Sequence, residues 1–201
     1  MVGGLLPVAI ATLVLASGVG AAGPRVVVRP VPGTHLRMGV PVGWKSLDRA
    51  EALVLVQRIA SLNPQIASLV QTIANNGSLI KLVTYYPQLA GGFATNANVV
   101  AQSSPGSTVS SVLALELPLV RQVLHPIGLK KKSIRVAGRP AEEISFNARF
   151  NEPSGTALVN EMQIYVIDKG MLYVLTLTTL PAQRATYGAT FAAIVDSLSF
   201  G

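Results

Sequence analysis

The side chains that could carry acid–base or nucleophilic chemistry are sparse in this chain. It contains two histidines, His35 and His125, and no cysteine, which excludes a thiol nucleophile, a cysteine-based zinc site and a disulfide framework. A Ser-His-Asp set could recruit Asp168 or Asp196, but no G-x-S-x-G motif is present to display a hydrolase nucleophile. His125 lies at a predicted helix end, where we expect a capping or surface role. We therefore expect no enzymatic activity.

Metal and phosphate chemistry also lack a motif. The sequence has no H-E-x-x-H pair, EF-hand loop or acidic cluster, and no phosphate loop of the P-loop or dinucleotide type. Glu142 and Glu143 are adjacent in a predicted strand, so their side chains point to opposite faces and cannot form a carboxylate pair by themselves. We expect neither a bound metal nor a cofactor.

The densest charge in the sequence is a basic run. The chain has a formal net charge of +7, and the run comprises Lys130, Lys131, Lys132, Arg135 and Arg139. Such a run favours binding to an anionic lipid, an envelope polymer or another envelope protein. The alternative is a solvated loop that keeps an apolar protein soluble. No aromatic residues alternate with the charges, so we expect no nucleic acid as a partner.

A second candidate surface is apolar. Residues 46–75 have helical spacing and form a predicted helical hairpin or one bent helix, with Ser46 as its N-cap. Its apolar face is wider than one core stripe, which indicates a hydrophobic partner or ligand surface. The alternative is that neighbouring helices bury both sides. The residues that widen this face are Leu53, Leu55, Val56 and Ile59.

The N-terminal segment has the features of a targeting signal or a membrane anchor. Residues 1–22 carry no charged side chain, and an apolar stretch over residues 5–16 is followed by small residues. This order is typical of a signal peptide that is cleaved near Ala22. An uncleaved anchor is the second interpretation, since about 20 apolar residues can span a bilayer, and a buried first helix is the third. We expect an extracytoplasmic protein, secreted or anchored in the cell membrane by this segment.

The rest of the chain predicts one domain. Residues 23–34 are rich in proline and glycine and indicate a linker, and residues 35–201 form the domain. The strands greatly outnumber the crossovers that a parallel sheet needs, so we expect an α+β fold with a central antiparallel sheet and helices on its faces. The expected strands are 35–40, 79–85, 93–102, 133–137, 143–150, 157–167 and 171–179, and the expected helices are 46–75, 109–124 (kinked or divided at Pro118) and one that opens at Pro181.

Several short segments follow one another in a recognisable order. They are Pro41-Val42-Gly43-Trp44, the Gly-Phe-Ala-Thr-Asn-Ala-Asn-Val segment at 92–99, Val136-Ala137-Gly138-Arg139-Pro140-Ala141, Gln163-Ile164-Tyr165-Val166, Tyr173-Val174-Leu175-Thr176 and the closing segment 194–200. This ordered set, over roughly residues 35–201, resembles the PsbP-like superfamily, especially its bacterial envelope branch of LpqN- and DcrB-like proteins. The resemblance implies an α/β/α sandwich and a mostly non-enzymatic, exported or lipid-anchored protein. Unlike many envelope members, the chain has no cysteine to carry a lipid.

These observations together predict a non-enzymatic, exported or membrane-anchored envelope protein that acts as a binding or accessory module. The alternative function is a carrier or sensor of a hydrophobic ligand, held between the sheet and the helices at 46–75.

Overall fold

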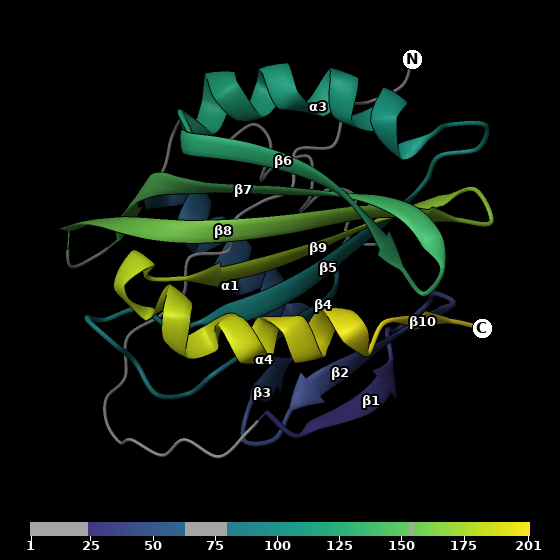
Figure 1. The fold of residues 1–201 in the computed structure, drawn as a ribbon. Helices are drawn as coiled ribbons and strands as arrows, with labels where there is room; N and C mark the ends of the chain where they lie inside the picture. The colour runs from purple at the N-terminus through teal and green to yellow at the C-terminus, as the bar shows by residue number, and fades with distance from the viewer. Residues whose placement is uncertain (1–23, 63–79, 153–154) are drawn as a thin grey trace.

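The computed structural model describes residues 24–62, 80–152 and 155–201. These residues form two antiparallel sheets and three α-helices in a layered α+β fold (Figure 1), as predicted. The expected signal peptide or anchor at residues 1–22 lies outside the described residues. The part of the expected helical segment that follows residue 62 lies outside them as well.

The larger sheet carries the centre of the fold. Its strands are β3 (Lys45–Leu47), β4 (Ile80–Tyr85), β5 (Asn96–Ser103), β6 (Ile127–Val136), β7 (Arg139–Glu152), β8 (Gly155–Asp168) and β9 (Met171–Thr179). They lie in the order β3-β4-β5-β9-β8-β7-β6, and every neighbouring pair is antiparallel. The turn between β8 and β9 uses Lys169 and Gly170 at φ 48° and 73°, which matches the twist of a two-residue hairpin. The predicted central antiparallel sheet is therefore confirmed.

A smaller sheet joins the two ends of the described chain. Its strands are β1 (Val26–Pro30), β2 (Leu36–Pro41) and β10 (Ser199–Phe200), in the order β1-β2-β10. The predicted linker at residues 23–34 is thus wrong in part, since it contains β1. Its consecutive β-branched valines favour an extended strand, and β1 pairs with β2 along its whole length.

The helix α1 (Arg49–Leu62) begins directly after Asp48. The Asp48 carboxylate accepts a hydrogen bond from the Glu51 N–H, and the Glu51 carboxylate accepts one from the Asp48 N–H. This reciprocal pair is a capping box. The prediction of Ser46 as the N-cap is wrong, because Ser46 belongs to β3 and pairs with Thr84.

The helix α3 (Val109–Leu124) has a capping box at Thr108 and Ser111 and runs through Pro118 without a break. Proline removes one backbone hydrogen bond, to the carbonyl four residues earlier. That residue, Ala114, is exposed, so water can satisfy its carbonyl. The predicted division at Pro118 therefore does not occur. Among the described helices, none is long and apolar enough to span a membrane.

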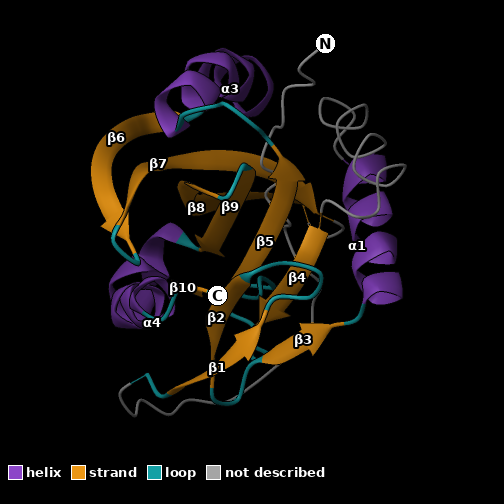
Figure 2. Ribbon diagram, turned by 90° about the vertical axis from the view of Figure 1, so that its right-hand side faces the viewer, coloured by secondary structure: helices purple, strands orange, loops and turns teal. Residues whose placement is uncertain are grey.

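The helices cover the two faces of the larger sheet. Helices α1 and α3 pack on one face, and α4 (Arg184–Asp196), which follows the short 3-10 helix η1 (Pro181–Gln183), packs on the other (Figure 2). The core is accordingly divided into two clusters. Phe93, Leu113, Phe146 and Phe150 lie in the cluster under α1 and α3. The cluster under α4 also includes the inner face of the smaller sheet.

Candidate binding sites

Two rows of polar side chains cross the centre of the larger sheet. One row consists of Asn96, Thr178 and Glu161, and the next consists of Asn98, Thr176 and Gln163. All six side chains are fully buried. They share the face of α1 and α3, because Glu161 and Gln163 pair with Phe146 and Ile144 of that core cluster. We call these six residues the polar rows.

Hydrogen bonds connect alternate residues along β8. The Tyr165 hydroxyl donates to Gln163 Oε1 at 3.0 Å, and Gln163 Nε2 donates to Glu161 Oε2 at 2.9 Å. Burial raises the pKa of Glu161 from 4.5 to about 8, against the opposing effect of the Gln163 hydrogen bond. Burial also raises the pKa of Tyr165, and the carboxyl groups of Glu116 and Glu161 raise it further. Burial therefore favours the uncharged form of the Tyr165–Gln163–Glu161 chain.

Several polar atoms of the rows have no hydrogen-bond partner in the described part of the chain. They are both side-chain polar atoms of Asn98, the hydroxyls of Thr176 and Thr178, and Oε1 of Glu161. A buried polar group without a partner costs about 1–3 kcal/mol. By contrast, the buried hydroxyls of Thr95 and Thr179 lie 2.8 Å apart and bond to each other. The polar rows therefore offer uncharged donors and acceptors that a polar molecule could satisfy.

Two helices border the polar rows. In strand order the rows on β5, β9 and β8 lie between β4 and β7, and α1 lies against both of these flanking strands. Helix α3 lies against β7 and β8 and contributes the buried Glu116. The position between sheet and helices that was predicted for a ligand thus combines an apolar part with hydrogen-bonding groups.

The predicted basic run lies on a strand. It was expected between a helix and a short strand, but β6 begins at Ile127 and includes the lysines. Lys130 and Lys132 share one face of β6, opposite Ser145 and Glu143, and Lys131 lies on the other. The strand is longer than predicted because its ten residues pair with β7 despite their polarity.

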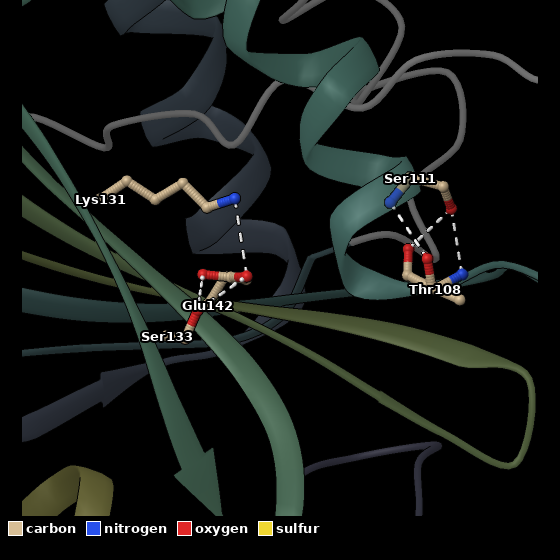
Figure 3. Close-up of polar contacts among 5 residues, drawn as sticks. All are labelled: Thr108, Ser111, Lys131, Ser133 and Glu142. Carbon is tan, nitrogen blue, oxygen red and sulfur yellow. Dashed lines mark hydrogen bonds and ion pairs between the residues drawn. The ribbon is translucent and has the colours of Figure 1, made fainter.

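The five basic residues differ in whether they form ion pairs or hydrogen bonds within the chain. Lys131 Nζ lies 3.5 Å from Glu142 Oε1, and Ser133 also bonds to that carboxylate (Figure 3). Arg139 Nε donates to Asp168 Oδ1 at 2.7 Å, and its guanidinium lies over the Phe200 ring. Arg135 donates to the Gly138 carbonyl. Within the described residues, Lys130 and Lys132 are exposed and take part in no ion pair, so they are the members of the run free to bind an anion.

The predicted hydrophobic surface is described only at Leu55. Leu55 is half-buried and packs against the core cluster under α1 and α3, so it points toward the sheet. The side chains of Leu53, Val56 and Ile59 lie outside the described part of the structure. The neighbouring Val54 is 66% exposed. The prediction for this surface stays untested.

Of the candidate catalytic residues, both histidines and Asp196 are exposed, whereas Asp168 is buried in its ion pair with Arg139. His125 is exposed at the end of α3, with φ 44°, and His35 is exposed in the turn between β1 and β2. Among the described residues, no group of three or more His, Asp and Glu side chains is placed to hold a metal. The buried polar chemistry of the described chain is that of amides, hydroxyls and carboxyl groups.

Sequence reasoning did not identify the polar rows as a site. Their members occur within segments that carry the family resemblance, at Asn96 and Asn98, at Gln163 and at Thr176. The available signal was polar residues at alternate positions inside strands that are otherwise apolar. A strand in which both faces are buried does not show from its own pattern which face contains them.

No protein-family model and no curated protein sequence matches the chain. Solved structures do match in fold. Cyanobacterial PsbP (CyanoP) from Synechocystis aligns with a TM-score of 0.56 at 12% identity, over 93% of this chain and 98% of that protein. LpqN of Mycobacterium tuberculosis, described as involved in cell envelope biogenesis, aligns with a TM-score of 0.47 at 12% identity, over 82% of each chain. A Pseudomonas aeruginosa protein of unknown function, a putative regulator, has a TM-score of 0.47 at 18% identity, over 58% of this chain and 80% of that one. With the antiparallel sheet and its helices in the same arrangement as in cyanobacterial PsbP, this chain has a PsbP-like fold.

Proposed function

We propose that this chain is a non-enzymatic, extracytoplasmic envelope protein, exported or anchored by residues 1–22, that acts as a binding or accessory module. The observation that carries the proposal is the exposed pair Lys130 and Lys132 on β6, which is an edge strand of the larger sheet and pairs with β7 alone among the described strands. Edge strands commonly carry lysines that discourage pairing with other chains. Two exposed cations on one face of the strand, neither of which forms an ion pair among the described residues although Glu143 lies opposite Lys132, are also suited to an anionic polymer or protein.

The PsbP-like fold and the absence of a recognised catalytic motif support the non-enzymatic part of this proposal. The apolar N-terminal sequence supports export or anchoring. Fractionation of cells that express the full chain, followed by intact-mass measurement, tests both fates of residues 1–22. Recovery of the uncleaved chain in the soluble cytoplasmic fraction contradicts the localisation.

The binding part is tested with a charge-reversed pair, Lys130→Glu with Lys132→Glu. We expect weaker, salt-dependent binding of the full chain to a soluble polyanion such as polyglutamate, measured by titration at low and moderate salt. Lys45→Glu with Arg184→Glu is a charge-matched control, because both residues are exposed but lie on β3 and at the start of α4. Equal loss in both variants indicates a general charge effect and contradicts a site on β6.

A second function is favoured by the polar rows, namely a carrier or sensor of a ligand between the sheet and α1. The rows add a requirement to the predicted hydrophobic ligand, because its buried part must also donate and accept hydrogen bonds. Native mass spectrometry of the full chain purified from its host tests this function. A ligand lost in Asn98→Leu and retained in the control Asn147→Leu supports it, and consistently empty wild-type protein contradicts it.

A further inference from the structure

Exposed apolar side chains gather at the edge of the smaller sheet. Val27, Val28 and Val42 are 47%, 41% and 64% exposed. The Val42 N–H donates to the Arg25 carbonyl at 2.8 Å, which holds Val42 beside the start of β1. Because β1 is an edge strand, its outer side is open to another surface. We call residues 25–42 the β1–β2 ribbon.

The ribbon is basic as well as apolar. Arg25, Arg29 and Arg37 are all exposed, and the sequence from residue 24 to residue 47 contains no aspartate or glutamate. One carboxylate borders it at β2, since Asp196 precedes Ser197, whose hydroxyl accepts a hydrogen bond from the Gly39 N–H. The three arginines of the ribbon still leave a positive surface with valines between its charges.

The register distributes these groups along both sides of β1. Val28 and Pro30 pair with Gly39 and Arg37, so Val28, Pro30 and Arg37 share one face. Val27 and Arg29 project to the other side of the same edge strand. An apolar edge flanked by arginines matches the boundary between lipid headgroups and acyl chains, where apolar and basic groups are both favourable.

The N-terminal sequence limits how far this ribbon can be from a membrane. Val26 is four residues after Ala22 in the sequence, and four residue steps of fully extended chain span about 14 Å at most. If residues 1–22 are retained as an anchor, the start of β1 must lie within that distance of the bilayer. If they are cleaved near Ala22, the new amino group adds a positive charge next to Arg25. In Figure 1 strand β6 begins beside α3 at the top of the molecule and β1 lies at the bottom, while the turn after β6 descends toward the smaller sheet, where the Arg139 guanidinium lies over the Phe200 ring.

We propose that the β1–β2 ribbon rests on an anionic lipid bilayer, with its valines at the headgroup boundary and its arginines on lipid phosphates, while β6 faces away from the membrane. This proposal rests on the extracytoplasmic location proposed above. In this proposal the β1–β2 ribbon contacts the membrane, and Lys130 and Lys132 are available to a soluble anionic partner.

Labelling tests the orientation directly, because the chain has no native cysteine and any introduced one is unique. The full chain carrying Val28→Cys or Lys132→Cys is labelled with an environment-sensitive fluorophore and mixed with vesicles of phosphatidylcholine and phosphatidylglycerol. Nitroxide-labelled lipids in these vesicles report proximity. We expect quenching and a blue shift of the label at residue 28 and little change at residue 132.

Four results overturn the proposal. Quenching at residue 132 alone would show the opposite orientation, with β6 on the membrane. Equal quenching at both positions would show that the chain has no preferred orientation on the bilayer. If the chain sediments with the vesicles and neither label is quenched, membrane association stands but the ribbon does not contact lipid. A chain that does not sediment with the vesicles overturns this inference and leaves the proposed function standing, because an exported chain that binds a soluble anion does not need to associate with lipid.

Charge reversal provides an independent measurement. Each basic residue near an anionic surface contributes about fivefold in binding, so Arg25→Glu with Arg29→Glu should weaken vesicle binding at least tenfold at low salt. The matched control is Lys130→Glu with Lys132→Glu, which makes the same charge change on β6 and should alter binding less than twofold. An equal effect of the two pairs contradicts a specific role for the ribbon.

Discussion

On the face of the larger sheet that α4 covers, β5, β8 and β9 present only apolar side chains at their centre. These include Ala97, Val99, Ile164, Leu175 and Leu177. On the face that α1 and α3 cover, the same three strands present the polar rows, which are equally buried. Strand propensity cannot explain the difference, since alternate residues of the same three strands supply the two faces. The comparison indicates that one face serves stability and the other retains polarity at a cost in stability, as binding sites often do.

Two buried carboxyl groups of β8 illustrate this difference. Asp168 shares the face of α4 and forms an ion pair with Arg139. Glu161 lies on the other face, receives a hydrogen bond from the neutral Gln163 amide, and has a pKa raised by burial. Charge is thus balanced by a partner on one face and removed by protonation on the other.

The largest expected effect comes from Glu161→Gln and depends on pH. The folded-state pKa of Glu161 is about 8 against an ordinary value of 4.5, so between these values only the folded state holds the proton. Its contribution to stability is full below the lower value and is lost as pH rises toward the upper one. Glutamine does not titrate. As pH rises over this range, the free energy of unfolding of the wild type should fall, and that of the variant should lack this decrease. We therefore expect the difference to shift in favour of the variant by several kcal/mol, at about 1.4 kcal/mol per pKa unit.

Urea denaturation at a series of pH values measures this difference. Glu143→Gln is the control, because Glu143 is only half-buried and its side chain points to the opposite face. A difference between Glu161→Gln and wild type that does not change with pH would contradict a buried, protonated Glu161.

Leu177→Asn places an amide in the apolar face. Leu177 is fully buried in the cluster under α4, so the variant loses apolar burial and gains unsatisfied polar atoms. We expect a loss of about 3–5 kcal/mol in the free energy of unfolding, measured by chemical denaturation. A loss below about 1 kcal/mol would show that this face accepts polarity as readily as the other.

Arg139→Met removes the partner of a buried carboxylate. Asp168 has 6% side-chain exposure, whereas Arg139 has 32%, so water compensates in part. We expect a loss of about 2–3 kcal/mol, less than for a fully buried pair. Arg135→Met serves as the control, since Arg135 is exposed and bonds only to the Gly138 carbonyl among the described residues. Equal stability of the two variants contradicts the importance of the Asp168 pair.

Thr176→Val has the smallest expected effect and the opposite sign. The side chain keeps its shape and loses a buried hydroxyl that has no partner in the described chain, so we expect a gain of about 1 kcal/mol in ligand-free protein. Thr179→Val is the matched control on the same strand, and it should lose about 1 kcal/mol because the Thr179 hydroxyl bonds to Thr95. Calorimetric unfolding of both variants tests this pair, and destabilisation by both contradicts a cost at the polar rows.

The strands of the second half of the chain were predictable from sequence because their signals are local. Alternation from Glu143 to Phe150 and the turn at Lys169 and Gly170 predicted β7, β8 and β9 correctly. Strands β1 and β10 were missed, because each is short and depends on pairing with β2. The full length of β6 was missed as well, because lysines are poor strand formers in isolation and only the pairing with β7 extends it.

The candidate sites were less predictable than the fold. The basic run was recognised by its charge, but the engagement of Lys131 and Arg139 depends on Glu142 and Asp168, which come from other strands. The polar rows assemble across β5, β9 and β8, so no single segment displays them. Local pattern identified the strands, and the register between distant strands decided which side chains meet.

The pairing of β10 with β2 has a consequence for the order of assembly. Gly39 and Ser197 are hydrogen-bonded although they are 158 residues apart, and Phe200 lies opposite Leu36. Contacts between such distant residues form late, since closing a long loop is entropically unfavourable until other structure brings the ends together. During synthesis or passage across a membrane, the smaller sheet cannot be completed until the residues of β10 have emerged. A chain halted before that point would leave the edge of β2 at Leu36 and Arg37 unpaired, and quality-control proteases could recognise that open edge.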